Sequence, residues 1–267
     1  MIINKPLLVV FFFLVFFDLN LFSQAKSLYI YWGWNRANYT SSTVHFKDAN
    51  YDFELYKLSA KDKPSPFSFS TYFGIKNITI PQYNVRIGYF ITDRWSISIG
   101  TDHMKYVIIQ NQKTTIEGEI HLLNSPYKKE YHKEALMLDS SFLKMEHTDG
   151  LNFVNMDGRR DFKLFTKGKL DLRLILGVGG GIMIPRSDVT LLSQPRNDEF
   201  HLAGWGCTGF SAIKIKYSGF FIMNELKVGY INLSDILVDQ QHSGRASQAF
   251  GFFQYNLLFG YQFRLGH

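Results

Sequence analysis

Residues 253–265 read Phe-Gln-Tyr-Asn-Leu-Leu-Phe-Gly-Tyr-Gln-Phe-Arg-Leu. Every odd-numbered side chain in this stretch is apolar or aromatic, and the even-numbered ones are polar or small, Leu258 excepted. Successive side chains of a β-strand point to opposite faces, so this strand would have one continuous apolar face. Strands that cross a membrane in a barrel show such alternation over about 9–11 residues. The stretch therefore predicts a membrane-crossing strand.

The same two-residue period recurs along the chain. Apolar and polar or small residues alternate over 28–34, 83–91, 95–99, 170–178 and 226–230. A soluble β-sandwich would alternate as well, but its strands average about 5–6 residues, which is shorter than several of these segments. The pattern favours a closed transmembrane sheet over the sandwich.

The connections between the segments fall into two classes. Residues 92–94, 166–168 and 217–219 predict tight turns. Longer polar connections are expected in three further places, 109–142, 186–198 and 236–246. Outer-membrane barrels have short periplasmic turns and longer external loops, which puts both chain ends in the periplasm and requires an even strand number. We expect an all-β, closed antiparallel transmembrane barrel of about ten strands, with eight or twelve as alternatives; the candidate strands are 27–37, 42–58, 67–77, 80–92, 94–108, 146–165, 169–185, 199–216, 219–235 and 247–265.

The first residues predict an export signal. Lys5 precedes the apolar run Pro6–Phe17, which is shorter than the roughly 20 residues of a membrane-spanning helix. Small residues follow, so residues 1–23 are expected to be a signal peptide with cleavage near Ser23 to Ala25. The alternative is an uncleaved anchor. The barrel domain is expected to cover 24–267.

Composition narrows the expected partners. Aromatic residues make up 16% of the chain, which suits a lipid-facing surface with aromatic girdles. The net charge of +6 is compatible with anionic lipid or lipopolysaccharide, and no basic run predicts nucleic-acid binding. The lone Cys207 can form neither an intrachain disulfide nor a cysteine-rich metal site, and no cofactor is expected.

The alternation also places charged residues on the inward side of the expected barrel. A barrel of eight strands has an interior just filled by side chains, and buried charges need partners. A lumen packed with ion pairs is therefore the favoured interpretation, and a narrow polar channel is the alternative. We expect the glycines of 177–181 to permit strand curvature or close approach. The predicted lumen residues are Asp52, Glu54, Arg86, Asp171, Arg173, Lys214, Lys216, Glu225, Lys227 and Arg264.

A polar cluster provides candidate catalytic residues. His147 and Asp149 follow the expected long loop 109–142, and Asp102 and His103 lie at the outer end of a preceding candidate strand. If the two strands are neighbours, histidines and carboxylates could meet near the outer rim. Such a group suits general acid/base chemistry or a divalent cation.

Taken together, the export signal, repeated hairpins and aromatic last strand resemble bacterial outer-membrane β-barrel proteins. Tyr261-x-Phe263-x-Leu265 resembles the C-terminal signal that the barrel-insertion machinery reads, although two further residues follow it. This resemblance implies location in the bacterial outer membrane. A smaller resemblance, to lipid A deacylase barrels, rests on His147 in the run His147-Thr148-Asp149-Gly150, where Asp149 stands in place of the nucleophilic serine.

Three functions stay open from the sequence. The favoured hypothesis is a structural or interaction barrel with a charge-filled lumen, without enzymatic activity. The alternatives are a hydrolase that modifies outer-leaflet lipid and a narrow channel for small solutes.

Overall fold

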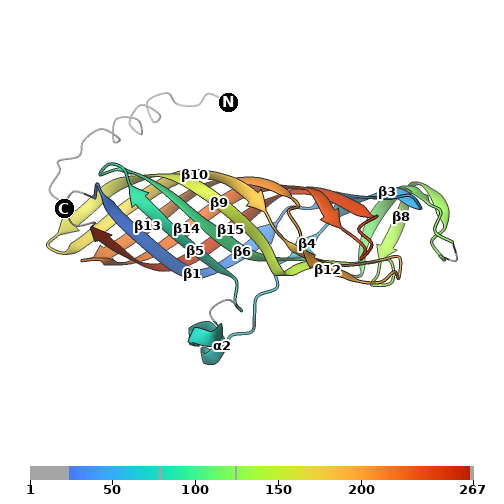
Figure 1. Ribbon diagram of the computed structural model, residues 1–267, viewed down its shortest axis with the longest axis horizontal. Coiled ribbons are helices and arrows are strands. Elements are labelled where there is room, and N and C mark those ends of the chain that lie inside the picture. The colour runs from blue at the N-terminus through green and yellow to red at the C-terminus, as the bar shows by residue number, and fades with distance from the viewer. Residues whose placement is uncertain (1–23, 78–79, 124, 265–267) are drawn as a thin grey trace, which may run out of the picture.

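Eight long antiparallel strands close into a barrel in the computed structural model, which describes residues 24–77, 80–123 and 125–264 (Figure 1). The barrel closes because β1 pairs with β15 along its whole length, from Ser27 opposite Arg264 to Tyr39 opposite Phe252. In spatial order the strands are β1 (Ser27–Tyr39), β5 (Tyr83–Phe90), β6 (Trp95–Ile108), β9 (Leu143–Lys167), β10 (Leu170–Met183), β13 (Gly204–Tyr217), β14 (Phe220–Leu237) and β15 (Arg245–Arg264).

The closed barrel has eight strands, one of the two alternatives, and not the ten that the sequence favoured. Two of the ten candidates account for the difference. Residues 42–58 form a hairpin above the barrel, and 67–77 form the short helix α2 (Phe69–Phe73) and the 3₁₀ turn η1 (Ile75–Asn77). Ser68 starts α2, since its hydroxyl accepts a hydrogen bond from the Thr71 backbone at 3.1 Å.

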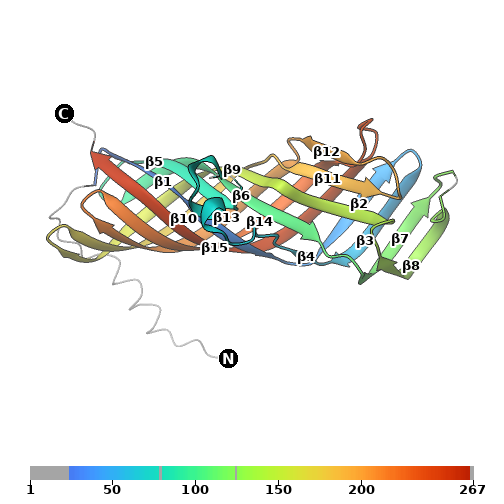
Figure 2. The same ribbon diagram turned by 90° about the horizontal axis from the view of Figure 1, so that it is seen from below.

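A second set of strands prolongs the sheet beyond one end of the barrel (Figure 2). The expected loops 109–142 and 186–198 contain hairpins of this set. We call these strands, with the ends of β6, β9, β14 and β15 that continue alongside them, the outer extension. Its strands are β2 (Ser42–Asp48), β3 (Tyr51–Leu58), β4 (Ala60–Lys61), β7 (Gln112–Ile120), β8 (Lys129–Leu138), β11 (Arg186–Leu191) and β12 (Asn197–Phe200).

At the opposite end of the barrel the strands are joined by tight turns. The Ile91 backbone donates to the Trp95 carbonyl at 2.9 Å, which closes the turn between β5 and β6. Gly168, with a φ of 60°, and Ser218, with a φ of 58°, make the other two turns in the left-handed region. Short turns mark the periplasmic end of outer-membrane barrels, and we name the two ends accordingly: the turn end is called periplasmic and the end with the outer extension is called outer.

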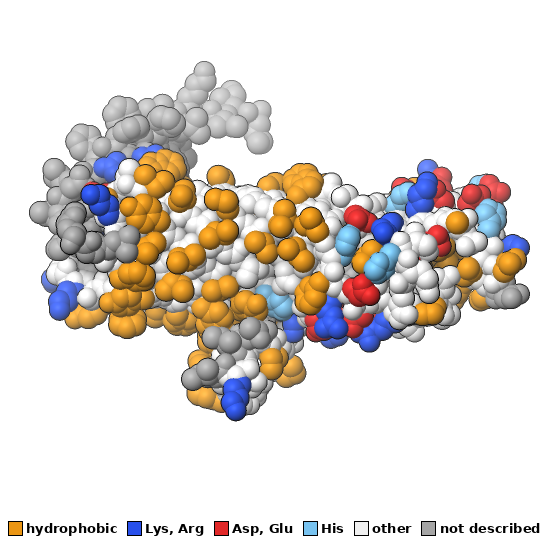
Figure 3. Space-filling view, in the orientation of Figure 1, with side chains coloured by type: hydrophobic (Ala, Val, Ile, Leu, Met, Phe, Trp, Pro, Cys, Tyr) orange, Lys and Arg blue, Asp and Glu red, His pale blue; other side chains and the backbone are white. Residues whose placement is uncertain are grey.

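The predicted alternation produces an apolar belt around the barrel. In β13, for example, Ile213 and Ile215 are exposed whereas Lys214 is buried. Figure 3 shows hydrophobic side chains covering the barrel half of the visible face. The exposed apolar side chains include Ile30, Ile87, Ile97, Ile99, Met156, Leu176, Val178, Ile213, Ile215, Ile222, Val228, Phe253 and Phe259.

In water such a belt would be strongly unfavourable, whereas a closed sheet with an apolar exterior satisfies every requirement of a membrane-spanning barrel. The chain therefore has the architecture of a membrane-spanning β-barrel. Among the described residues no helix has the length and apolar character needed to cross a membrane. The predicted signal peptide lies outside the described residues and stays a prediction.

Candidate functional site in the barrel lumen

Six buried charges form a closed ring across the lumen, alternating in sign. We call them the charge ring, and in order around it they are Arg86, Asp157, Arg159, Glu225, Lys227 and Asp102. They come from β5, β6, β9 and β14, and every one of these side chains is at most 2% exposed. The three cations and three anions balance, which is the arrangement that charges removed from water require.

Asp157 connects the two arginines of the charge ring. Its carboxylate lies 2.8 Å from the Arg86 guanidinium and 2.9 Å from that of Arg159. Asp157 and Arg159 are two residues apart on β9, so both face the lumen. The ring of Phe210 lies 4.6 Å from the Arg159 guanidinium carbon, which adds a cation–π contact.

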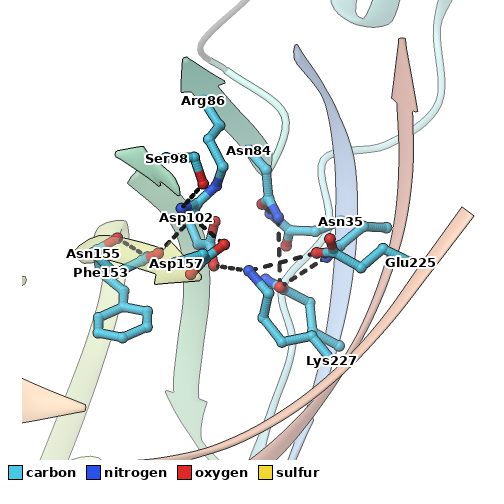
Figure 4. A network of polar contacts seen from close by, with 12 residues as sticks. Asn35, Asn84, Arg86, Ser98, Asp102, Phe153, Asn155, Asp157, Glu225 and Lys227 are labelled. Atoms are coloured by element: carbon cyan, nitrogen blue, oxygen red, sulfur yellow. Dashed lines mark hydrogen bonds and ion pairs between the residues drawn. The ribbon is translucent and has the colours of Figure 1, made fainter. Parts of the chain in front are cut away.

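Lys227 completes the other half. Its ammonium lies 2.5 Å from Asp102 and 3.5 Å from Glu225 (Figure 4). Two further ion pairs close the charge ring. The Asp102 carboxylate lies 3.6 Å from the Arg86 guanidinium, and the Glu225 carboxylate lies 3.6 Å from the Arg159 guanidinium. Glu225 and Lys227 are two positions apart on β14, the same spacing as Asp157 and Arg159 on β9.

Side-chain amides fill the space beside the charge ring. Asn256 donates to Glu225 at 2.9 Å, and Asn35 donates to Asn84 at 2.5 Å. Asn155 accepts from Arg86. Amides both donate and accept, so they satisfy charged groups that have used only part of their hydrogen-bonding capacity.

An aromatic layer lies on the periplasmic side of the charge ring. It consists of buried residues of β1, β5, β10, β13, β14 and β15, and Lys214 passes through it to reach Asp161 at 2.8 Å. A cavity of about 10 Å³ remains within it, which is room for roughly one water. The larger members of the layer are Tyr29, Tyr31, Phe90, Ile175, Phe210 and Phe221.

On the outer side of the charge ring the interior becomes apolar. Met104 and Leu151, paired across β6 and β9, are fully buried. Above them the outer extension encloses its own core. In this core the ring centroid of Phe53 lies 5.2 Å from that of Phe46, on which it stacks, and 5.8 Å from that of Phe142. The charge ring is thus enclosed between two apolar layers.

The four candidate catalytic residues are placed differently. Asp102 belongs to the charge ring, whereas His103 points away from the lumen and is buried there. Its ring centroid lies 4.9 Å from that of Tyr83, and its Nδ1 is hydrogen-bonded to Asn152 at 2.8 Å. Met104 separates Asp102 from Tyr106, the inward residue of β6 that pairs with His147. Asp149 is exposed and bonded to Arg186 at 2.7 Å. No hydrogen bond or ion pair joins any two of these four described residues.

His147 lies in the apolar core of the outer extension, above the membrane-spanning part of β9. Its ring is 5.7 Å from that of Tyr106 and is fully buried. Burial lowers the pKa of His147 to about 4, and a backbone contact with Arg186 opposes this shift. The imidazole is therefore neutral at physiological pH and has no route to a substrate at the surface.

Most of the predicted lumen residues face inward. Arg86, Glu225 and Lys227 are in the charge ring, and Lys214 crosses the aromatic layer. Nearer the periplasm Asp171 pairs with Arg173 at 2.6 Å and with Lys216 at 3.8 Å. Arg264, at the periplasmic end of β15, is exposed.

Two predicted lumen residues lie elsewhere. Asp52 and Glu54 are on the outer face of β3, whose inward residues are apolar. Asp52 bonds to His45 at 2.6 Å and to Lys47 at 2.8 Å, and these two hydrogen bonds lower the pKa of its carboxyl. Because 42–58 was interpreted as a crossing strand, its polar face was assigned to the lumen.

The sequence interpretation did not include Asp157, Arg159 or Asp161 among the predicted lumen residues. The signal was present, because 157, 159 and 161 are charged at every second position. Among the described residues no group of three or more histidine, cysteine or acidic side chains is arranged to hold a metal ion.

Comparisons with known proteins return similar structures only. No family and no curated protein matches the sequence. The outer membrane protein OprG from Pseudomonas aeruginosa is 11% identical, with a TM-score of 0.46, over 90% of this chain and 97% of that one. The attachment invasion locus protein Ail of Yersinia pestis, in complex with a heparin analogue, is 10% identical, with a TM-score of 0.35, over 90% and 99%. Neither similarity bears on the activity of this chain.

Proposed function

We propose that the protein is a sealed barrel that holds a rigid β-structure above the outer membrane as an interaction surface. The observation that carries the proposal is the charge ring, which spans the lumen from four strands. Each of its members is ion-paired with two other members, which favours a structural role over the binding of a solute.

The layers on either side support a closed lumen. The aromatic layer leaves a cavity of about 10 Å³, and the opposite side is filled by fully buried Met104 and Leu151. Removing one partner of a buried ion pair costs about 3–5 kcal/mol. A movement that opened several such pairs at once would therefore be costly. A conducting state would have to open the charge ring and both of the apolar layers that enclose it.

The outer extension supports the role as an interaction surface. Flexible external loops would need no core, yet this part of the chain buries Phe46, Phe53 and Phe142. Its outer faces are charged, with pairs such as Lys47–Asp52 and Lys129–Glu134. A rigid scaffold with a charged exterior suits recognition of a macromolecule or glycan outside the cell. The lipids around the belt, lipopolysaccharide among them, and the insertion machinery that reads the last strand are the further partners that we propose.

Conductance tests the sealed lumen. The purified barrel, shown to be folded by its faster migration on unheated gels, is added to planar bilayers. We expect no current steps. Reproducible single-channel steps from the folded band would overturn the proposal in favour of a channel.

Surface labelling tests whether the outer extension is exposed outside the cell. In a Cys207→Ser background, Glu130→Cys lies on β8 in the outer extension and Ser218→Cys lies in a tight turn of the opposite end. A membrane-impermeant maleimide applied to intact cells should label the first variant only. Ser218→Cys should react once the outer membrane is opened. Labelling in the reverse pattern would invert the orientation and remove the display role.

A further inference from the structure

The segment between β4 and β5 leaves the barrel wall sideways. We call residues 64–81, apart from 78–79, the foot; it contains α2 and η1, and Figure 1 shows α2 hanging beside the barrel. It exposes three phenylalanine side chains, Phe67 at 73%, Phe69 at 75% and Phe73 at 57%. Three exposed phenylalanines within seven residues form a patch that water disfavours.

The foot is attached to the apolar belt of the barrel. The ring of Trp34, on β1, packs against the rings of Phe73 and Tyr72, with centroid distances of 5.3 Å and 5.7 Å. The same indole contacts Phe259 of β15, a belt residue, at 5.7 Å. The apolar surface of the foot is therefore continuous with the lipid-facing surface of the barrel, and Figure 3 shows the foot beside the belt.

Polar contacts hold the root of the foot in place. Arg36 donates to the Tyr72 hydroxyl at 2.7 Å, and that hydroxyl donates to the Ser65 carbonyl at 2.9 Å. Lys105 reaches the Ser65 hydroxyl at 3.4 Å and the Ile80 carbonyl at 3.3 Å. The root is thus polar and cationic. The three exposed phenylalanines lie on the rest of the foot, where Lys76 is also exposed.

This division matches the outer leaflet of a membrane. Aromatic rings are stable at the boundary of the hydrocarbon, and cationic side chains are stable at the level of the headgroups. We propose that the foot inserts into the outer leaflet and holds lipid acyl chains against the barrel wall beside Trp34. The occupant is lipid, because the belt with which the foot is continuous already faces lipid. The inference rests on the membrane location and is independent of the sealed lumen.

Spin-label accessibility tests the insertion. In the Cys207→Ser background, Phe69→Cys and Phe73→Cys carry a nitroxide in phosphatidylcholine vesicles, one variant at a time. Val178→Cys, in the belt, is the lipid control, and Glu130→Cys, in the outer extension, is the water control. Collision with oxygen is compared with collision with a water-soluble nickel complex.

We expect both foot labels to collide with oxygen in preference to nickel, as the Val178 label does. Nickel accessibility equal to that of the Glu130 label would overturn the proposal by placing the foot in water. Shielding from both reagents would also overturn it, since a second protein surface would then cover the foot. Two label sites separate insertion from a local effect of one substitution, and all four variants should show the fast-migrating folded band.

Discussion

Gly179 on β10 lies directly opposite Asp157 on β9, and a Cβ at Gly179 would stand 2.1 Å from the Asp157 carboxylate. This glycine therefore makes room for the central carboxylate of the charge ring. Three glycines of the run 177–181 show the close approach that the sequence analysis expected, since a Cβ at Gly177 would stand 2.2 Å from the Phe210 ring and one at Gly181 would stand 2.0 Å from the Val154 carbonyl.

Gly179→Ala should push Asp157 away from its two arginines. Overpacking a filled interior costs about 1–3 kcal/mol, so we expect a lower urea midpoint for loss of the folded band in detergent. Gly158→Ala is the matched control, because a Cβ there meets nothing within 4 Å. Equal stability of the two variants would contradict the assigned role of Gly179.

Lys227→Met should destabilise the barrel by about 3–5 kcal/mol, because it leaves Asp102 and Glu225 buried without their shared cation. The double variant Lys227→Met with Glu225→Gln restores equal numbers of cations and anions in the charge ring. We expect it to recover part of the lost stability, measured by urea unfolding of the folded band. Losses that simply add would show that the two residues are not coupled.

The pattern of alternation predicted the eight barrel strands well because lipid imposes one continuous apolar face. Residues 253–265 are an example, since their odd positions face outward as expected as far as Phe263. The β7 and β8 strands of the outer extension were missed because only their inner faces are apolar, and their charged outer faces resemble a polar loop. Residues 67–77 were counted as a strand because the even strand number demanded it more than the pattern did, and the Ser68 cap went unrecognised.

The candidate site was less predictable because it depends on contacts across the lumen. Alternation assigns Asp102 and Glu225 to the inside, but only the register of the closed barrel shows which charges meet. A bulge between Met104 and Tyr106 shifts the pairing with β9. That shift separates inward His147 from exposed Asp149, which no one-dimensional pattern reveals.

Acid should loosen the outer extension through His147. Its pKa falls from 6.5 to about 4 on burial, so between these values the unfolded state binds more protons than the folded state. The stabilising contribution of the neutral imidazole is complete above pH 6.5 and is lost as the pH falls towards 4, up to about 3 kcal/mol. The loss of stability is measured by hydrogen exchange of the β6 and β9 amides in the outer extension, as a function of pH. His147→Phe should flatten this pH dependence, and an unchanged slope in that variant would exclude His147 as its source.

Phe142→Ala should unfold the outer extension without opening the barrel. Phe142 is fully buried against Phe53, and truncation of a core phenylalanine costs about 3–5 kcal/mol. The barrel strands keep the charge ring and the lipid contact of the belt, neither of which includes Phe142. Limited proteolysis of intact cells should therefore cut within 109–142 in the variant and spare the wild type, whereas the membrane fragment keeps its fast migration on unheated gels. Glu130→Ala, an exposed change on β8, should resist the protease like the wild type. Loss of the folded band along with the protease site would mean that the outer extension and the barrel unfold as one unit.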